Sequence, residues 1–145
     1  METKILWEYV NAFSAAYDVH RKRVMSRFNL SAIEVDVLLF LANNPDINTA
    51  SDIVRKRKIT KSHVSLAVHS LLEKGYLSKT EDAFNKKIRH LFLTEKSSEI
   101  VQFGLDQQRQ FSSFLLEGAS DEELRYVKQN LLRVLNRLKN YNPPD

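Results

Sequence analysis

The feature that most constrains the fold is a change of periodicity between Thr49 and Leu93. Apolar side chains first recur three and four positions apart, as in helices, and then alternate, as in strands. The helical segments are residues 49–56 and 60–74, and the strand segments are residues 77–81 and 87–93. Thr60 suits the cap of the second helix and Gly75 its end. The order predicts two packed helices followed by a β-hairpin.

Helical segments flank this region on both sides. Ser31 with Glu34, and Ser120 with Glu123, have the spacing of a capping box at a helix start. Further helices are predicted over residues 3–27, 31–43, 94–117 and 120–141. The fold class is therefore mainly α with a small β-wing. A winged helix-turn-helix is expected over residues 31–93, with a second, helical region formed by residues 1–30 and 94–145.

The charge is unevenly distributed along the chain. Residues 49–93 hold ten Lys/Arg and four Asp/Glu, a net charge of +6, whereas the remainder holds 12 Lys/Arg and 14 Asp/Glu. A basic block within a folded segment favours a polyanion as partner. The alternative is an ordinary solvated helix face.

The helix over residues 60–74 carries the best candidates for contact with DNA. Its core face is formed by Val64, Ala67, Val68 and Leu71. The opposite face carries Ser62, Ser65, Leu66, His69 and Glu73, and Lys61 and His63 lie near the first turn. Ser and His side chains hydrogen-bond to base edges, and an outward Leu can touch a thymine methyl. A lysine near the helix start suits a phosphate. The alternative is an amphipathic helix facing water.

The hairpin adds a second set of candidates at its tip: Asn85, Lys86, Lys87 and Arg89. A basic two-stranded ribbon can enter the minor groove or contact phosphates. Exposed loops are often rich in lysine, so this signal depends on the neighbouring pair of helices.

The sequence at this point resembles the MarR-type transcription regulators. Residues 71–77 (LLEKGYL) are similar to the end of the family's recognition helix and the start of its wing, and residues 93–96 (LTEK) to its wing-to-helix junction. The family usually has Gly where Ser97 stands, and Asp-Arg-Arg where Asn85, Lys86 and Lys87 stand. Lysine keeps the charge of arginine but loses its bidentate geometry. Asn in place of Asp removes a salt bridge that would brace the wing.

The resemblance implies a homodimer that binds a pseudo-palindromic site in double-stranded DNA. Its interface would be built from the N-terminal helix and the last two helices. The last helix carries an apolar stripe formed by Leu124, Val127, Leu131, Val134, Leu138 and Tyr141. Such a stripe fits a dimer interface, although packing within one subunit is the alternative.

The resemblance also implies a small aromatic or anionic effector, bound between the dimer region and the DNA-binding lobe. The expected ligand-binding residues are Trp7, Phe13, Tyr17 and His20, with Tyr9 and Phe40 nearby. An aromatic stripe at helical spacing is also typical of plain core.

Enzymatic and membrane functions have little support. The chain has no Cys, and its four His lack the spacing of a metal site. Three Gly leave no room for a phosphate-binding loop. We therefore expect no catalytic residue, no metal and no cofactor. No apolar run approaches ~20 residues, and the N-terminus lacks the layout of a signal peptide, which predicts a cytoplasmic protein.

The sequence favours a sequence-specific DNA-binding regulator, expected to repress and to associate with the nucleoid. The alternatives are a winged-helix module that docks a protein, and an architectural protein that binds DNA without sequence preference.

Overall fold

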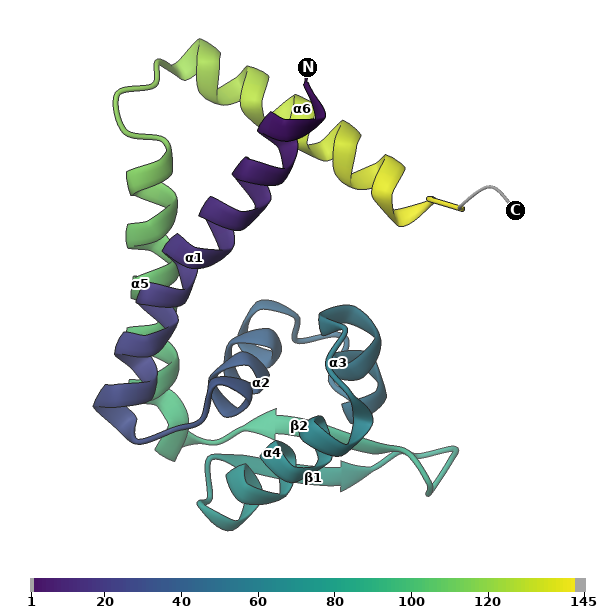
Figure 1. The fold of residues 1–145 in the computed structure, drawn as a ribbon. Helices are drawn as coiled ribbons and strands as arrows, with labels where there is room; N and C mark the ends of the chain where they lie inside the picture. Colours follow the sequence, from purple (N-terminus) through teal and green to yellow (C-terminus); the bar gives the residue numbers. More distant parts are fainter. Residues whose placement is uncertain (1, 143–145) are drawn as a thin grey trace. The chain divides into compact units, whose positions relative to one another are not determined.

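The computed structural model describes residues 2–142, and those residues form six helices and one two-stranded sheet (Figure 1). The elements are α1 (Thr3–Phe28), α2 (Ala32–Asn43), α3 (Ala50–Arg57), α4 (Lys61–Glu73), β1 (Leu77–Glu81), β2 (Arg89–Leu93), α5 (Ser98–Leu115) and α6 (Asp121–Lys139). The chain divides after Phe111 into two compact units. The last three residues of the expected C-terminal region lie outside the described part.

The helices begin where the sequence offers caps. Ser31 and Glu34 form the expected capping box of α2, and Ser120 and Glu123 form that of α6. Thr60 accepts a hydrogen bond from the His63 backbone N–H and caps α4. These side chains satisfy backbone donors that have no partner inside the helix.

Two further signals fix the helix-turn-helix and its exit into the wing. Thr49 caps α3 through a capping box with Asp52, a pairing that was not predicted from the sequence. Gly75, with φ of +75°, follows α4, and the N–H of Tyr76 donates to the carbonyl oxygen of Leu71 at 2.9 Å. A left-handed residue at this position closes a helix and suits glycine.

The core of the first unit is centred on α2. An amphipathic helix would bury a single stripe, but eight consecutive residues of α2, from Glu34 to Leu41, are buried. Burial extends around the helix because α1, α4, α5 and β2 all pack against it.

Helix α5 approaches α2 closely at one position. A Cβ added to Gly104 would lie 2.5 Å from Leu39 Cδ2. Any side chain at this position would therefore require the Leu39 side chain to shift. Helix α5 begins at Ser98, after a single 3-10 turn over Glu95–Ser97, rather than at Thr94 as expected.

The two strands pair antiparallel, with Leu77 opposite Leu93 and Glu81 opposite Arg89. The second strand begins two residues later than expected. The hairpin is attached to the start of α3, because the Leu91 N–H donates to the Asn48 carbonyl oxygen at 2.9 Å. This attachment fixes the wing to the helix-turn-helix.

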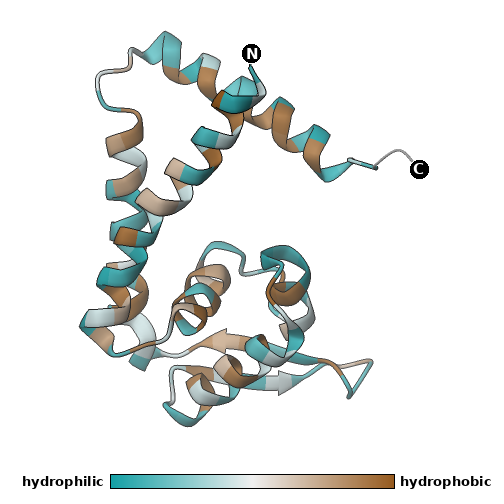
Figure 2. Cartoon of the chain, in the orientation of Figure 1, coloured by the Kyte–Doolittle hydropathy of each residue, from teal (hydrophilic) through white to brown (hydrophobic). Residues whose placement is uncertain are grey.

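The second unit contains α6, and every residue of this helix is at least partly exposed. Figure 2 shows hydrophobic residues along its length. The expected apolar stripe is present from Leu124 to Leu138 but uncovered, with Leu131 56% and Leu138 66% exposed. Tyr141, expected to continue the stripe, lies beyond the end of α6 at Lys139. Within the described part of the chain, no helix has the length and apolar character needed to cross a membrane.

Candidate nucleic-acid interface

Helix α4 presents the outward face that the sequence predicts. Val64, Ala67, Val68 and Leu71 are buried, as expected. The predicted contact residues are all exposed: Lys61, Ser62, His63, Ser65, Leu66 and His69. Leu66 is 68% exposed, although it is apolar. The His69 ring nitrogen Nε2 lies 3.3 Å from a Glu73 carboxylate oxygen, so this imidazole is oriented along the helix surface.

The far end of α4 is fixed by a buried carboxylate on α2. Glu34 accepts hydrogen bonds at 2.7 Å from both Ser70 Oγ and Lys74 Nζ, and a third from the Ser31 backbone N–H. Burial alone would raise the pKa of Glu34, but the bonds from Lys74, Ser70 and Ser31 hold it below its ordinary value. The ionised carboxylate therefore clamps α4 against α2.

Two grooves flank the exposed ridge of α4. One, of about 330 Å³, lies toward the start of α2 and is lined by His63, Leu66 and Lys74 among others. The other, of about 270 Å³, lies toward α3 and is lined by Ser51, Lys61 and Ser65 among others. The exposed ridge of α4 lies between them.

The four predicted wing residues serve two different roles. Arg89 forms an ion pair with Glu81 at 3.1 Å and donates to the Lys86 carbonyl oxygen, so it braces the hairpin. Asn85 Oδ1 accepts the Lys87 N–H at 3.1 Å and shapes the turn. Lys86 and Lys87 are exposed, and neither forms an ion pair with another described residue. The two lysines are the cations of the tip that are available to a partner.

The wing is braced by a histidine on β2 that was not among the predicted contact residues. His90 Nε2 donates to Asp82 Oδ2 at 2.9 Å, and His90 Nδ1 lies 2.7 Å from Asn48 Oδ1. The bond from His90, with those from the N–H groups of Phe84 and Asn85, lowers the pKa of Asp82. Asn85 therefore does not leave the wing unbraced, because Asp82 pairs with His90.

The wing and the start of α3 enclose a groove of about 510 Å³. Its lining contains hydroxyl and basic side chains together with two carboxylates: Thr49, Ser51, Lys87, Arg89, His90, Asp52 and Asp82. Asp52 pairs with Arg55 and Asp82 with His90, which leaves the hydroxyl groups and the lysine to contact a sugar-phosphate backbone.

Ser97 stands where the MarR-type pattern has glycine. It is fully buried, and its hydroxyl donates to the Thr94 carbonyl oxygen at 2.8 Å. The junction between β2 and α5 thus accommodates a serine with its polar atom satisfied.

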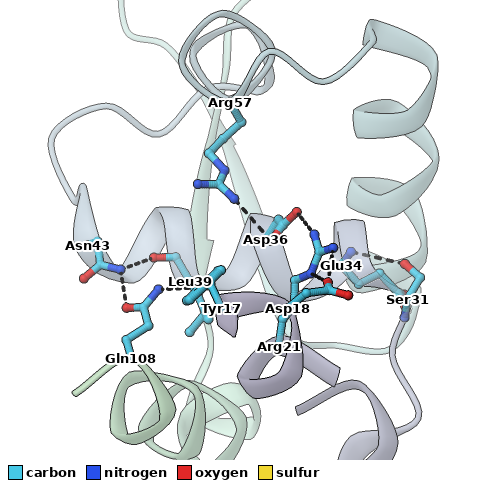
Figure 3. A network of polar contacts seen from close by, with 10 residues as sticks. All are labelled: Tyr17, Asp18, Arg21, Ser31, Glu34, Asp36, Leu39, Asn43, Arg57 and Gln108. Atoms are coloured by element: carbon cyan, nitrogen blue, oxygen red, sulfur yellow. Dashed lines mark hydrogen bonds and ion pairs between the residues drawn. The ribbon is translucent and has the colours of Figure 1, made fainter. Parts of the chain in front are cut away.

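A network of charged side chains joins the helix-turn-helix to α1 (Figure 3). The buried Asp36 on α2 pairs with Arg21 of α1 at 3.0 Å and with Arg57 of α3 at 3.3 Å. Arg21 also pairs with Asp18 at 2.6 Å. Burial would lower the pKa of Arg21, but Asp18 and Asp36 raise it, so this residue stays charged.

The residues predicted to bind an effector are divided between packed and open surroundings. Phe13, Tyr17 and His20 surround Phe111 with ring centroids 5.0–5.5 Å away, and Trp7 is 61% exposed. The residues Tyr17, Asp36, Leu39, Phe40, Asn43, Asn44, Arg57 and Gln108 line a pocket of about 80 Å³. Figure 3 shows Tyr17 beside Gln108 and Asn43. Pockets for drug-sized ligands measure ~300–1,000 Å³, so this pocket is small.

Among the described residues, no group of three or more His, Cys, Asp or Glu side chains is placed to hold a metal ion.

Residues 28–88 match the model of the MarR family. The fold of the whole chain is similar to that of a MarR transcriptional regulator from Methanosarcina mazei Go1, at 16% identity and a TM-score of 0.78, covering 97% of this chain and 94% of that one. It is also similar to a protein from Listeria monocytogenes, described as a MarR family transcriptional regulator and solved in complex with a 26-mer DNA. That match has 20% identity and a TM-score of 0.79, and it covers 100% of this chain and 99% of the other.

A third similar structure is the MarR protein of Peptoclostridium difficile, with 21% identity, a TM-score of 0.77, and coverage of 97% and 90%. No curated protein matches the chain. The expected fold class and family resemblance are thus confirmed: residues 28–88 match the MarR family model, and the fold of the chain is similar to that of MarR regulators.

Proposed function

We propose that the chain is a DNA-binding transcription regulator that reads double-stranded DNA with α4 and contacts its backbone with the wing. The observation that carries this proposal is the exposed ridge of α4, whose polar side chains lie opposite a fully buried face. Lys86 and Lys87, which pair with no described acid, lie on the same unit. The DNA complex of the similar Listeria protein supports the same function. A DNA partner also implies a place with the nucleoid in the cytoplasm.

Within this proposal, the predicted contact residues have different tasks. Ser65, Leu66 and His69 on the ridge would contact base edges, whereas Lys61, Lys86 and Lys87 would contact phosphates. Arg89 would act indirectly, because its guanidinium is already held by Glu81. The groove between the wing and α3 would follow the backbone.

We also propose that the functional unit is a homodimer. The apolar side chains of α6 are uncovered in one chain, and those of the first half of α1 are too, including Trp7 at 61% exposed. Exposed apolar patches of this kind mark interaction surfaces. Two copies would present two α4 helices to successive major grooves, ~34 Å apart, and a pseudo-palindromic site follows from that symmetry.

We further propose that the protein represses transcription and that a small aromatic or anionic effector relieves this repression. The pocket beside Tyr17 holds the Arg57 cation and lies on the network that joins α1 to α3. A ligand larger than the ~80 Å³ space would have to displace these helices. Titrating the DNA complex with aromatic carboxylates, beginning with benzoate, tests this step by the release of DNA.

The experiment that tests DNA reading is selection of binding sites from a random duplex library, followed by gel-shift titration at several salt concentrations. We expect an enriched pseudo-palindrome and a steep loss of affinity with salt. Replacing His69 or Ser65 with Ala should change which site is preferred. Equal affinity for random DNA would instead indicate an architectural protein, and no binding at low salt would indicate a module that docks proteins.

A further inference from the structure

The loop that joins β1 and β2 carries an aromatic side chain that the fold does not use. Phe84 is 99% exposed, more than any other large hydrophobic residue in the described part of the chain. Figure 1 shows this loop extending away from α2 and α4, and Figure 2 shows hydrophobic colour within it. A phenyl ring in water forgoes the stabilisation that burial would give. Its exposure therefore points to a partner that covers it.

The backbone that carries Phe84 is held firmly. Asp82 Oδ1 accepts hydrogen bonds at 2.9 Å from the N–H groups of both Phe84 and Asn85. The Ile88 N–H donates to the Asn85 carbonyl oxygen, also at 2.9 Å. Asp82 is itself fixed by His90 on the second strand. The ring thus projects from a pre-ordered turn, which reduces the entropy lost when it binds.

The surroundings of Phe84 indicate what kind of partner fits. Lys86 and Lys87 follow it in the chain, and both are exposed and outside any ion pair with the described residues. A protein pocket for an aromatic anchor is usually depleted of charge at its core. An apolar ring flanked by two cations suits a DNA groove, where bases lie between two rows of phosphates.

We propose that Phe84 enters the minor groove of DNA as a wedge and partly unstacks one base step, while Lys86 and Lys87 contact the phosphates beside it. This inference rests on the proposed DNA-binding function and adds a residue by which the wing bends its site. The minor groove is ~6 Å wide, too narrow for the two strands of the hairpin but accessible to a ring at its tip. Apolar wedges of this kind kink DNA toward the major groove.

A wedge also contributes to sequence preference. Pyrimidine–purine steps such as TA and CA unstack most easily, so they cost least to open. We therefore expect a TA or CA step in the operator under each wing. This preference would arise without any hydrogen bond from the wing to a base.

The test compares Phe84→Ala and Phe84→Leu with the unaltered chain on the duplex selected by that chain. Affinity is measured by fluorescence anisotropy over a range of salt concentrations. Bending is measured by energy transfer between dyes at the two duplex ends, and unstacking by 2-aminopurine placed at the step under the wing. The double variant Lys86→Ala/Lys87→Ala serves as the electrostatic comparison.

We expect Phe84→Ala to bind about tenfold more weakly, in line with the loss of one stacked base. Its bend and 2-aminopurine signal should fall, but its salt dependence should not change because no charge is removed. Phe84→Leu should retain most of the bend, since leucine also acts as a wedge. The double lysine variant should differ from Phe84→Ala in both respects. Its affinity should depend less on salt, and its 2-aminopurine fluorescence should stay high because the ring still unstacks the base step.

Equal affinity and equal bending for Phe84→Ala and the unaltered chain would overturn the wedge while leaving the DNA-binding function intact. Failure of netropsin, a minor-groove ligand, to compete with the wing would also overturn it. A lower melting temperature of Phe84→Ala would assign the ring a structural role instead. If the unaltered chain binds no duplex at low salt, both the wedge and the proposed function fall.

Discussion

Helices α2 and α6 begin with the same capping motif, but α2 is buried within the chain and α6 is exposed. Each starts with a serine and, three residues later, a glutamate in a capping box. Eight consecutive residues of α2 are buried, whereas every residue of α6 is at least partly exposed. Local sequence thus determines where a helix begins, but not whether its apolar side chains are covered within the chain.

The two capping glutamates differ in the same way. Glu34 is buried and accepts additional bonds from Ser70 and Lys74, but Glu123 bonds to Ser120 at the surface. The pKa of each is lowered, that of Glu123 by Ser120, and that of Glu34 by its partners despite its burial. The Glu34 carboxylate therefore joins α2 to α4, whereas the Glu123 carboxylate only caps the start of α6.

The largest expected effect comes from a core residue of α2. Leu38 is fully buried, so Leu38→Ala should lower the free energy of unfolding by about 3 kcal/mol. Leu138→Ala removes the same atoms from α6, where the side chain is 66% exposed. Urea denaturation at several protein concentrations separates the two. The loss of unfolding free energy in Leu38→Ala should be independent of protein concentration, whereas any loss in Leu138→Ala should depend on it. Equal, concentration-independent losses would contradict the comparison.

The next largest effect concerns association. Leu131→Glu places a charge in the uncovered stripe of α6 and should weaken self-association by about a hundredfold, because an unpaired charge would be buried. Gln129→Glu is the matched control, because it lies about 160° around the helix. Sedimentation velocity measures both. A sharp loss of dimer in the control, or a monomeric unaltered chain, would show that α6 is not the interface.

The buried carboxylate gives a smaller effect with a defined pH dependence. Glu34→Gln should cost about 2 kcal/mol of unfolding free energy at pH 7, since hydrogen bonds to a charged group are lost. The folded-state pKa of Glu34 lies below its ordinary value of 4.5. Its stabilisation is therefore present above pH 4.5 and lost as the pH falls through the folded-state pKa. The variant should lose less stability than the unaltered chain on acidification.

Glu123→Gln is the control for that experiment. Its carboxylate is exposed and caps a single helix start. The loss of unfolding free energy should therefore be smaller than that of Glu34→Gln. Thermal unfolding from pH 7 to pH 3 tests the pair. The clamp on α4 would be refuted by identical pH profiles for the two variants.

The smallest effect separates the charges of the wing from those of α6. Lys86→Ala/Lys87→Ala should weaken binding of all sequences by about tenfold and reduce the salt slope by about 2 for each wing. Lys128→Ala/Lys139→Ala removes the same charge from α6 and should leave the slope unchanged. Anisotropy titrations on selected and random duplexes measure both. A similar reduction by the α6 pair would mean that net charge, rather than the wing, drives binding.

Much of the fold was predictable because its signals are local. Two capping boxes, the exit glycine Gly75 and the buried face of α4 were identified from spacing. The pairing of His90 with Asn48, and that of Asp36 with Arg21 and Arg57, could not be identified, because these residues come from segments far apart in the chain. Arg89 was predicted to contact DNA from its position near the wing tip. Its ion pair with Glu81 depends on the register of the two strands, which the sequence pattern did not specify.

The sequence by itself determined the order of elements, the helix starts, the outward ridge of α4 and the basic charge of the winged lobe. Hydrogen bonds within a few residues and the periodicity of apolar side chains are sufficient for these features. Only the tertiary structure decided that α2 is enclosed on all sides, that His90 braces the wing, and that Phe84 is left uncovered. Burial and long-range pairing depend on which segments meet in space, and a linear pattern does not specify that.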